Sequence, residues 1–256
     1  MKFFIENRKK QKIAILVEAR PNAKGLVFVM HGLGGFKEQP HLAVMAEAFL
    51  ESGYTAVRFD TTNTLGESDG NYEDATTTNY YEDLEDVIAW AETQPWYQEP
   101  FVLVGHSLGG LCVTLFAERH PEKVKGLAPI STVVSGKLSA ETPSYRAVEK
   151  EWRKTGWRVE ESRSKPGETK RLKWSHVADR LKYNVLPHVN RLTMPVLLIV
   201  GEKDQSTPPD HQKILYDALP GPKEFHVIQG APHTFRGEKH LKEIAGIFKN
   251  WIKKLL

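Results

Sequence analysis

The sequence predicts an α/β protein in which a mostly parallel central sheet is flanked by helices. Short unbroken apolar runs, at residues 26–30, 101–104 and 196–200, are typical of strands that are buried on both faces of a sheet. Between such runs lie segments whose apolar residues recur with the period of a helix. Strands that alternate with helices in this way favour parallel pairing with helical crossovers.

The length and composition are those of one globular unit. The chain has 256 residues, of which 40% are hydrophobic, enough for one core with layers on both sides of a sheet. A charged fraction of 26% with a net charge of only +3 gives no strong attraction to nucleic acid or to a membrane surface. We expect neither as a partner.

The sequence also indicates the cellular compartment of the protein. Cys112 is the single cysteine, so an internal disulfide is impossible, which suits a reducing environment. No apolar run approaches the roughly 7–15 residues of a secretory signal or the roughly 20 residues of a membrane span. We therefore expect a cytoplasmic protein.

The first half of the chain predicts most of the sheet. Residues 3–5 and 13–17 are expected to pair as a hairpin, and the run 26–30 ends in a glycine-rich loop at 31–35. The further elements expected here are a helix over 40–52 capped by Gly53, a strand over 54–59, a helix over 83–93, a strand over 101–104, a helix over 108–118 and a strand over 124–130.

The alternation resumes near the end of the chain. A strand is expected over 196–200, a helix over 211–219, a strand over 225–228 and an amphipathic helix over 241–255. Residues 135–190 differ, because they show no clear buried strand and carry twelve Lys and Arg against seven Asp and Glu between positions 141 and 182. We expect a core of residues 1–134 and 191–256, with 135–190 as an insertion.

Residues 105–109 form the strongest chemical signal, Gly-His-Ser-Leu-Gly. The pattern G-x-S-x-G stands between a predicted buried strand and a predicted helix, the context that a nucleophile elbow needs. The glycines let a strained turn present the Ser107 hydroxyl above the sheet, and the helix N-terminus favours negative charge there. The alternative, a Gly-Ser turn without chemistry, does not explain why strand, turn and helix occur together.

With this motif the chain resembles the α/β-hydrolase superfamily over nearly its whole length. The resemblance implies an α/β-hydrolase fold, a cap formed by residues 135–190, and a catalytic histidine after the last strand. The sequence Gly-Ala-Pro-His at 230–233 is similar to the family's approach to that histidine, which assigns His233 as the base. His226 and His240 are poorer candidates because they lie within a predicted strand and a predicted helix.

The resemblance also implies an acid between the serine and the histidine. Residues 201–204, Gly-Glu-Lys-Asp, resemble the turn that carries it, so Asp204 is the expected acid, with Glu202 and Asp210 as competing carboxylates. The order Ser107, Asp204, His233 is that of the fold. By the same resemblance the oxyanion hole consists of the backbone N–H groups of Leu33 and Leu108.

Several other features receive a simpler interpretation. The loop at 31–35 has the alternative of a plain glycine turn, and His31 is expected to serve its structure. Residues 59–70 resemble the family's loop after the fourth strand but are one residue longer and lack its first glycine, so we name no ligand contact there.

Cys112 is expected to pack in the core. No metal-ligand spacing, phosphate loop or dinucleotide fingerprint occurs, so neither a metal nor an organic cofactor is implied.

The resulting hypothesis is a serine hydrolase that cleaves a small-molecule carboxylic ester through an acyl-enzyme. The pattern most resembles bacterial carboxylesterases of the feruloyl or cinnamoyl esterase and monoacylglycerol-lipase kind. Thioesterase, lipase, amidase and peptidase share the same residues, and a ligand receptor on a hydrolase scaffold is the alternative of another class. Trp152 and Trp157 either line an acyl pocket or anchor the cap. The cap's basic surplus either favours anionic substrates or is a solvated surface.

Overall fold

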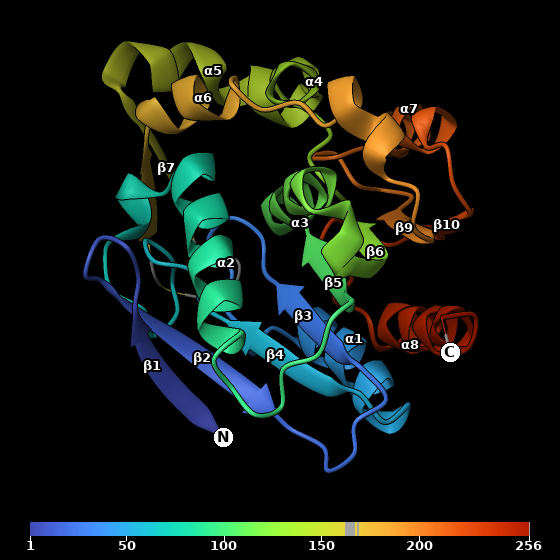
Figure 1. Cartoon of the computed structure of the whole chain (residues 1–256). Coiled ribbons are helices and arrows are strands. Elements are labelled where there is room, and N and C mark those ends of the chain that lie inside the picture. Colours follow the sequence, from blue (N-terminus) through green and yellow to red (C-terminus); the bar gives the residue numbers. More distant parts are fainter. Residues whose placement is uncertain (162–166, 168, 256) are drawn as a thin grey trace.

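The computed structural model describes residues 1–161, 167 and 169–255, so residues 162–166 and 168 of the predicted insertion and residue 256 of the predicted core lie outside the described residues. Its main feature is an eight-stranded sheet in the order β1-β2-β4-β3-β5-β6-β9-β10 (Figure 1). The strands are β1 (Lys2–Glu6), β2 (Lys12–Glu18), β3 (Leu26–Met30), β4 (Thr55–Phe59), β5 (Phe101–His106), β6 (Val124–Ile130), β9 (Val196–Gly201) and β10 (Lys223–Ile228).

Strand pairing follows the predicted pattern. The six strands from β3 to β10 in this sheet pair in parallel, and only the N-terminal hairpin of β1 and β2 runs antiparallel to its neighbours. Every residue of β3, β4, β5 and β9 is buried, as the apolar runs within β3, β5 and β9 predict. The mostly parallel α/β fold expected from the sequence is confirmed.

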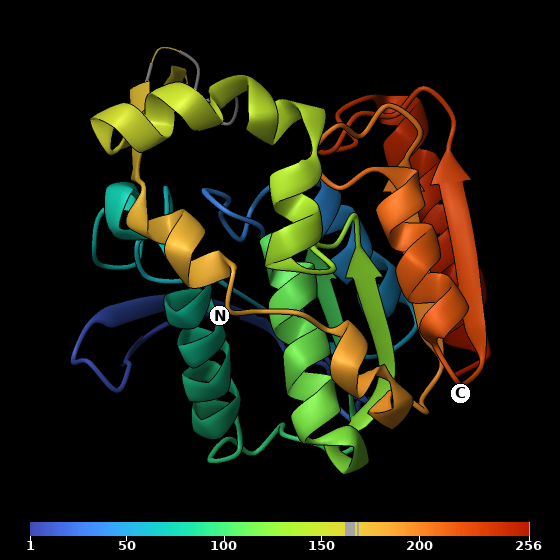
Figure 2. The ribbon, with the colours of Figure 1, turned by 90° about the horizontal axis from the view of Figure 1, so that it is seen from above.

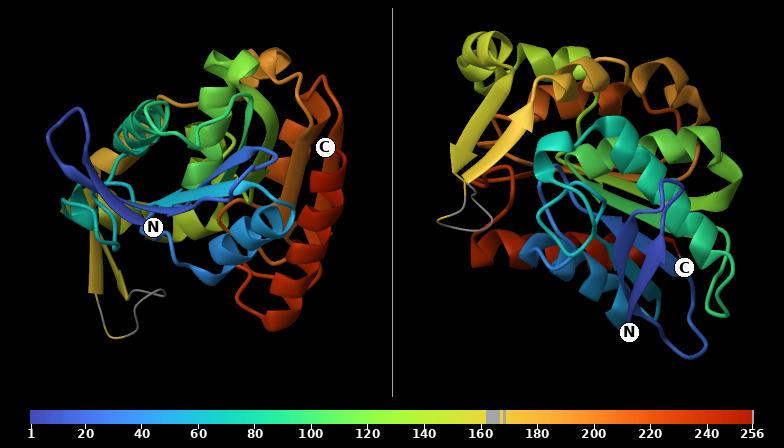
Figure 3. Two further views of the ribbon diagram at one scale, coloured as in Figure 1. Left: turned by 60° about the horizontal axis from the view of Figure 1, so that its bottom comes forward. Right: turned by 90° about the vertical axis from the view of Figure 1, so that its left-hand side faces the viewer.

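Helices cover both faces of the sheet. The main ones are α1 (Pro40–Glu51), α2 (Thr77–Ala91), α3 (Leu108–Arg119), α7 (Pro209–Ala218) and α8 (Glu238–Lys253). Figure 2 shows α2 and α3 side by side over one face, and Figure 3 shows α1 and α8 together on the opposite face. Within the described part of the chain, no helix combines the length and the apolar character that a membrane span requires.

One predicted helix begins earlier than expected. The apolar period of α2 suggested a start at Asp83, whereas the helix begins at Thr77, where the Thr76 side chain accepts a hydrogen bond from the Asn79 N–H. The first turn is polar, so hydrophobic periodicity does not reveal it. The N-cap threonine is the signal that would have done so.

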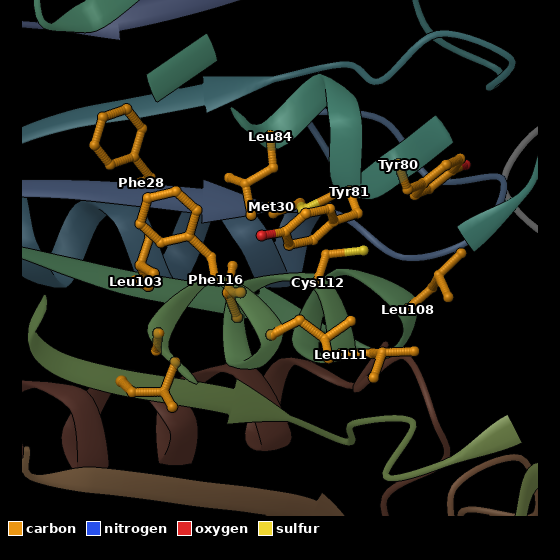
Figure 4. Packing of buried hydrophobic residues seen from close by; sticks show 14 of the residues in the cluster. Phe28, Met30, Tyr80, Tyr81, Leu84, Leu103, Leu108, Leu111, Cys112 and Phe116 are labelled. Atoms are coloured by element: carbon orange, nitrogen blue, oxygen red, sulfur yellow. The ribbon is translucent and has the colours of Figure 1, made fainter. Parts of the chain in front are cut away.

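Cys112 lies in the core between the sheet and the helices. Figure 4 shows its side chain among Tyr81, Leu84, Leu108 and Leu111, and the residue is fully buried. Burial raises the pKa of the thiol, so it stays protonated and unreactive at neutral pH. The sole cysteine is thus a packing residue, as the sequence suggested.

The segment between β6 and β9 adds no strand to the main sheet. It contains α4 (Gly136–Glu141), α5 (Pro143–Thr155), β7 (Trp157–Glu161), β8 (Thr169–Lys173), α6 (Ser175–Arg180) and a 3-10 helix (Leu186–Arg191). Strands β7 and β8 form a separate antiparallel hairpin, seen in the right-hand view of Figure 3. Sequence inspection missed this hairpin because its strands are half exposed and highly charged. The division into core and insertion at 135 and 190 stays a prediction.

Candidate active site

Ser107 occupies a strained turn between β5 and α3. Its backbone angles, φ 57° and ψ −114°, lie where residues with a side chain are rarely found, so the surrounding packing must hold it there. A Cβ at Gly105 would lie 2.4 Å from the Gly109 carbonyl oxygen, and a Cβ at Gly109 would lie 2.4 Å from the His31 carbonyl oxygen. The two glycines that flank the serine therefore allow the strand, the helix and the loop after β3 to meet closely.

This crowding predicts opposite effects for two Gly→Ala changes in helices. Gly109→Ala is expected to lower the free energy of unfolding by about 1–3 kcal/mol, because the new methyl group overpacks against backbone. Gly246→Ala is the control, since nothing lies within 4 Å of a Cβ at that position of α8. It is expected to raise the free energy of unfolding by about 0.5–1 kcal/mol. Urea unfolding measures both, and a stabilised Gly109→Ala would contradict the crowding.

The structure brings Ser107, His233 and Asp204 together from three loops at the carboxyl ends of β5, β10 and β9. His233 Nε2 lies 2.9 Å from Ser107 Oγ, and His233 Nδ1 lies 2.7 Å from Asp204 Oδ2. Because a carboxylate can only accept, Nδ1 carries the proton and Nε2 is left with a lone pair toward the serine hydroxyl. These contacts form one continuous hydrogen-bond chain.

Asp204 is held as a carboxylate by its own loop. Its Oδ1 accepts the N–H groups of Ser206 and Thr207, and its Oδ2 accepts the Thr207 hydroxyl, each at 2.9 Å. Burial opposes ionisation, but His233 and these hydrogen bonds outweigh it and hold the pKa of Asp204 below its ordinary value. Glu202 instead accepts the Gly230 N–H, and Asp204 is the sole carboxylate paired with His233 among the described residues.

His106, inside the G-x-S-x-G motif, holds the histidine loop. Its Nε2 lies 2.8 Å from the carbonyl oxygen of His233, to which it donates. Burial, with His41 and His233 close by, keeps the pKa of His106 well below its usual range, so the ring is neutral. Sequence reasoning had assigned no role to this side chain, and its place beside the serine was the signal that could have found it.

The backbone N–H groups of Leu33 and Leu108 are among those near Ser107 that have no hydrogen-bond acceptor in the described residues. In the loop after β3, the next two N–H groups are occupied, since Gly34 donates to the Tyr80 hydroxyl and Gly35 to the Gly32 carbonyl. Leu108 is the first residue of α3, where an N–H has no partner within the helix. Both leucines line the same cavity as Ser107.

Buried polar contacts fix the loops around this site. His31 donates from Nδ1 to the Gly32 carbonyl oxygen at 2.7 Å and accepts the Thr61 N–H at Nε2 at 3.0 Å, so it serves the loop structure, as expected. In the loop after β4, the buried Asp60 pairs with Lys37 Nζ at 2.7 Å and leaves no space for a side chain at Gly66. The side chain of Asp60 therefore occupies the space beside Gly66 in this loop.

Ser107 opens into a cavity of about 420 Å³ between the core and the 135–190 segment. This volume suits a small molecule. Trp152 is not among the lining residues; its ring is buried against Trp174 and His176, so it packs inside the 135–190 segment. Trp157 also lies off the cavity, beneath Arg171. Among the described residues, no group of three His, Cys, Asp or Glu side chains could hold a metal ion.

Comparison with known proteins agrees with this architecture. Residues 25–154 match the family described as alpha/beta hydrolase fold, and residues 165–240 match the family described as serine aminopeptidase, S33. An uncharacterized 31.7 kDa protein of Escherichia coli, from the traX-finO intergenic region, is 27% identical over 90% of this chain and 91% of its own length. The mouse mitochondrial palmitoyl-protein thioesterase ABHD10 is 27% identical over 87% of this chain and 71% of its own.

Solved structures show the same fold. Mouse alpha/beta hydrolase domain-containing protein 10 superimposes with a TM-score of 0.80 at 22% identity and covers all of both chains. Est1E from Butyrivibrio proteoclasticus, solved with bound ferulic acid, gives a TM-score of 0.79 at 22% identity over 99% of this chain and 98% of its own. At such identity these likenesses establish architecture alone. The match of residues 25–154 to the alpha/beta hydrolase fold family covers half of the sequence and shows that the chain belongs to the α/β-hydrolase family.

Proposed function

We propose that this protein is a serine hydrolase that cleaves carboxylic esters of small molecules through an acyl-enzyme intermediate. The observation that carries the proposal is the hydrogen-bond chain from Ser107 through His233 to Asp204, with the serine hydroxyl at the wall of a cavity. Within this proposal the 135–190 segment acts as a cap over the site, and the protein works in the cytoplasm.

The geometry supports a two-step acyl transfer. Ser107 Oγ bonds to the ester carbonyl carbon while its proton passes to His233 Nε2, and Asp204 stabilises the imidazolium that forms. The oxyanion accepts hydrogen bonds from the N–H groups of Leu33 and Leu108, each worth a few kcal/mol in a preorganised site. His233 then returns the proton to the leaving alcohol, and a water molecule releases the acid by the same route.

Thioester hydrolysis is a second candidate, because the matched mammalian relatives are named palmitoyl-protein thioesterases. Esters and thioesters use the same nucleophile, base and oxyanion donors, so the residues around Ser107 do not separate them. The fold also carries ligand receptors, and a receptor would bind a ligand without turning it over.

The test is a panel of p-nitrophenyl esters from acetate to decanoate, with thioesters of the same acyl chains, beside covalent labelling by a fluorophosphonate probe. We expect ester turnover and stoichiometric labelling. Turnover of the thioesters alone would favour the second candidate. A folded protein that hydrolyses neither series and resists the probe would overturn the enzyme assignment and favour a receptor.

A further inference from the structure

The cavity beside Ser107 has an unusually basic lining. Among the described residues, the Lys, Arg, Asp and Glu side chains of the lining are five cations and one carboxylate: Arg158, Lys170, Arg180, Lys203, Arg236 and Glu160. Three of the cations and Glu160 come from the 135–190 segment, on the hairpin β7–β8 and on α6. The wall that faces the core site is therefore positively charged.

Two of these cations share the single carboxylate. Glu160 accepts from Arg158 at 2.5 Å and from Lys170 at 2.9 Å. Aromatic rings support both cations, since the Arg158 guanidinium lies 5.7 Å from the centroid of the Trp152 ring and Lys170 Nζ lies 5.3 Å from that of Tyr72. These contacts hold the basic wall in one arrangement before any ligand binds.

Among the lining cations without an ion pair in the described residues, Lys203 and Arg236 are exposed, whereas the guanidinium of Arg180 is largely buried. Its Nε and Nη2 atoms are buried, and neither has a hydrogen-bond acceptor among the described residues. Its guanidinium carbon lies 5.6 Å from the centroid of the Tyr145 ring. Burial, with Arg158 close by, lowers the pKa of Arg180 to about 10 despite the opposing effect of Tyr145. A buried guanidinium without a partner is costly, and an anion in the cavity would relieve that cost.

We propose that the substrate is an ester whose acyl part carries a second, free carboxylate, which Arg180 binds while the ester carbonyl lies at Ser107. This proposal rests on the proposed esterase function and names its substrate class. Arg180 lines the cavity, and a guanidinium binds a carboxylate by charge-assisted hydrogen bonds. One such carboxylate would supply the counter-charge that Arg180 lacks, while Glu160 continues to balance its two neighbours.

The test compares esters of equal acyl length that differ only in the distal charge. The pairs are p-nitrophenyl hydrogen adipate against p-nitrophenyl hexanoate, and p-nitrophenyl hydrogen suberate against p-nitrophenyl octanoate. For the wild type we expect kcat/KM to favour the charged ester of at least one pair. In Arg180→Gln the ratio of charged to neutral kcat/KM should fall by about 10- to 100-fold, mainly through KM.

Arg146→Gln is the matched control, since it removes one positive charge from an exposed position of α5 that does not line the cavity. It should leave the ratio unchanged. Glu160→Gln should raise the ratio, because it removes the negative charge from the wall, and a gain cannot arise from misfolding. If Arg180→Gln does not fold, the ratio measured for Glu160→Gln is therefore the deciding test of the proposal.

Each outcome separates the two proposals. If the wild type cleaves none of the four esters, the esterase function fails and the substrate class fails with it. If both esters are cleaved but Arg180→Gln lowers them equally, or Glu160→Gln leaves the ratio unchanged, the esterase function stands and the carboxylate site is overturned.

Discussion

Ser107→Ala is expected to lower kcat for p-nitrophenyl hexanoate by about 10⁵- to 10⁶-fold, to a rate set by the remaining binding and oxyanion groups. The change removes the atom that forms the acyl-enzyme, while the strained turn keeps its shape because alanine retains the Cβ. In the mutant, water must attack the carbonyl directly, without a covalent intermediate to divide the barrier. Steady-state assays at high enzyme concentration measure the residual rate.

Ser139→Ala is the control, because Ser139 also lines the cavity but has no hydrogen bond to His233 among the described residues. It is expected to keep kcat within about threefold, as is usual for a substitution away from the reacting atoms. Fluorophosphonate labelling should disappear in Ser107→Ala and persist in Ser139→Ala. Retention of one tenth or more of the wild-type kcat by a folded Ser107→Ala protein would refute the assignment of the nucleophile.

Much of the fold could be predicted because its strongest signals are local. Strands β3, β5 and β9 contain unbroken apolar runs, and Ser107 and Asp204 each follow such a strand within a short turn. His233 follows β10, which is only partly buried. In a parallel sheet the carboxyl ends of neighbouring strands lie at one edge, so order along the chain already implies that the three side chains meet. Their hydrogen bonds in the structure agree with that expectation, while their roles await the kinetic tests.

The features that escaped prediction depend on contacts between distant parts of the chain. The hairpin β7–β8 has charged, half-exposed strands, and its place beside the core is fixed partly by ion pairs from Arg171 and Lys173 to residues 73 and 74. That the buried Arg180 Nε and Nη2 atoms have no hydrogen-bond acceptor among the described residues can be seen only from the positions of the neighbouring side chains. A count of basic residues could suggest an anionic ligand, but only the structure shows which cation is both buried and without an ion pair among the described residues.

Asp204→Asn is expected to lower kcat by about 10³- to 10⁴-fold with little change in the fold, because it reverses the histidine tautomer. The orientation of the new amide is fixed in advance. The Oδ1 position accepts two backbone N–H groups, so the amide oxygen must take it, and the NH₂ group must face His233 Nδ1. Nδ1 then has to accept, the proton moves to Nε2, and the ring can no longer take the proton from Ser107.

This reversal makes a prediction that simple loss of charge does not. In Asp204→Asn the activity should recover partly at high pH, where hydroxide replaces the missing base, while the wild type reaches a plateau. Glu202→Gln is the matched control, since it neutralises a carboxylate two residues away that contacts Gly230 and not His233. It should keep kcat within about threefold. A large loss in Glu202→Gln with a small one in Asp204→Asn would show that the acid is Glu202, because only the carboxylate that fixes the imidazole tautomer can have the larger effect.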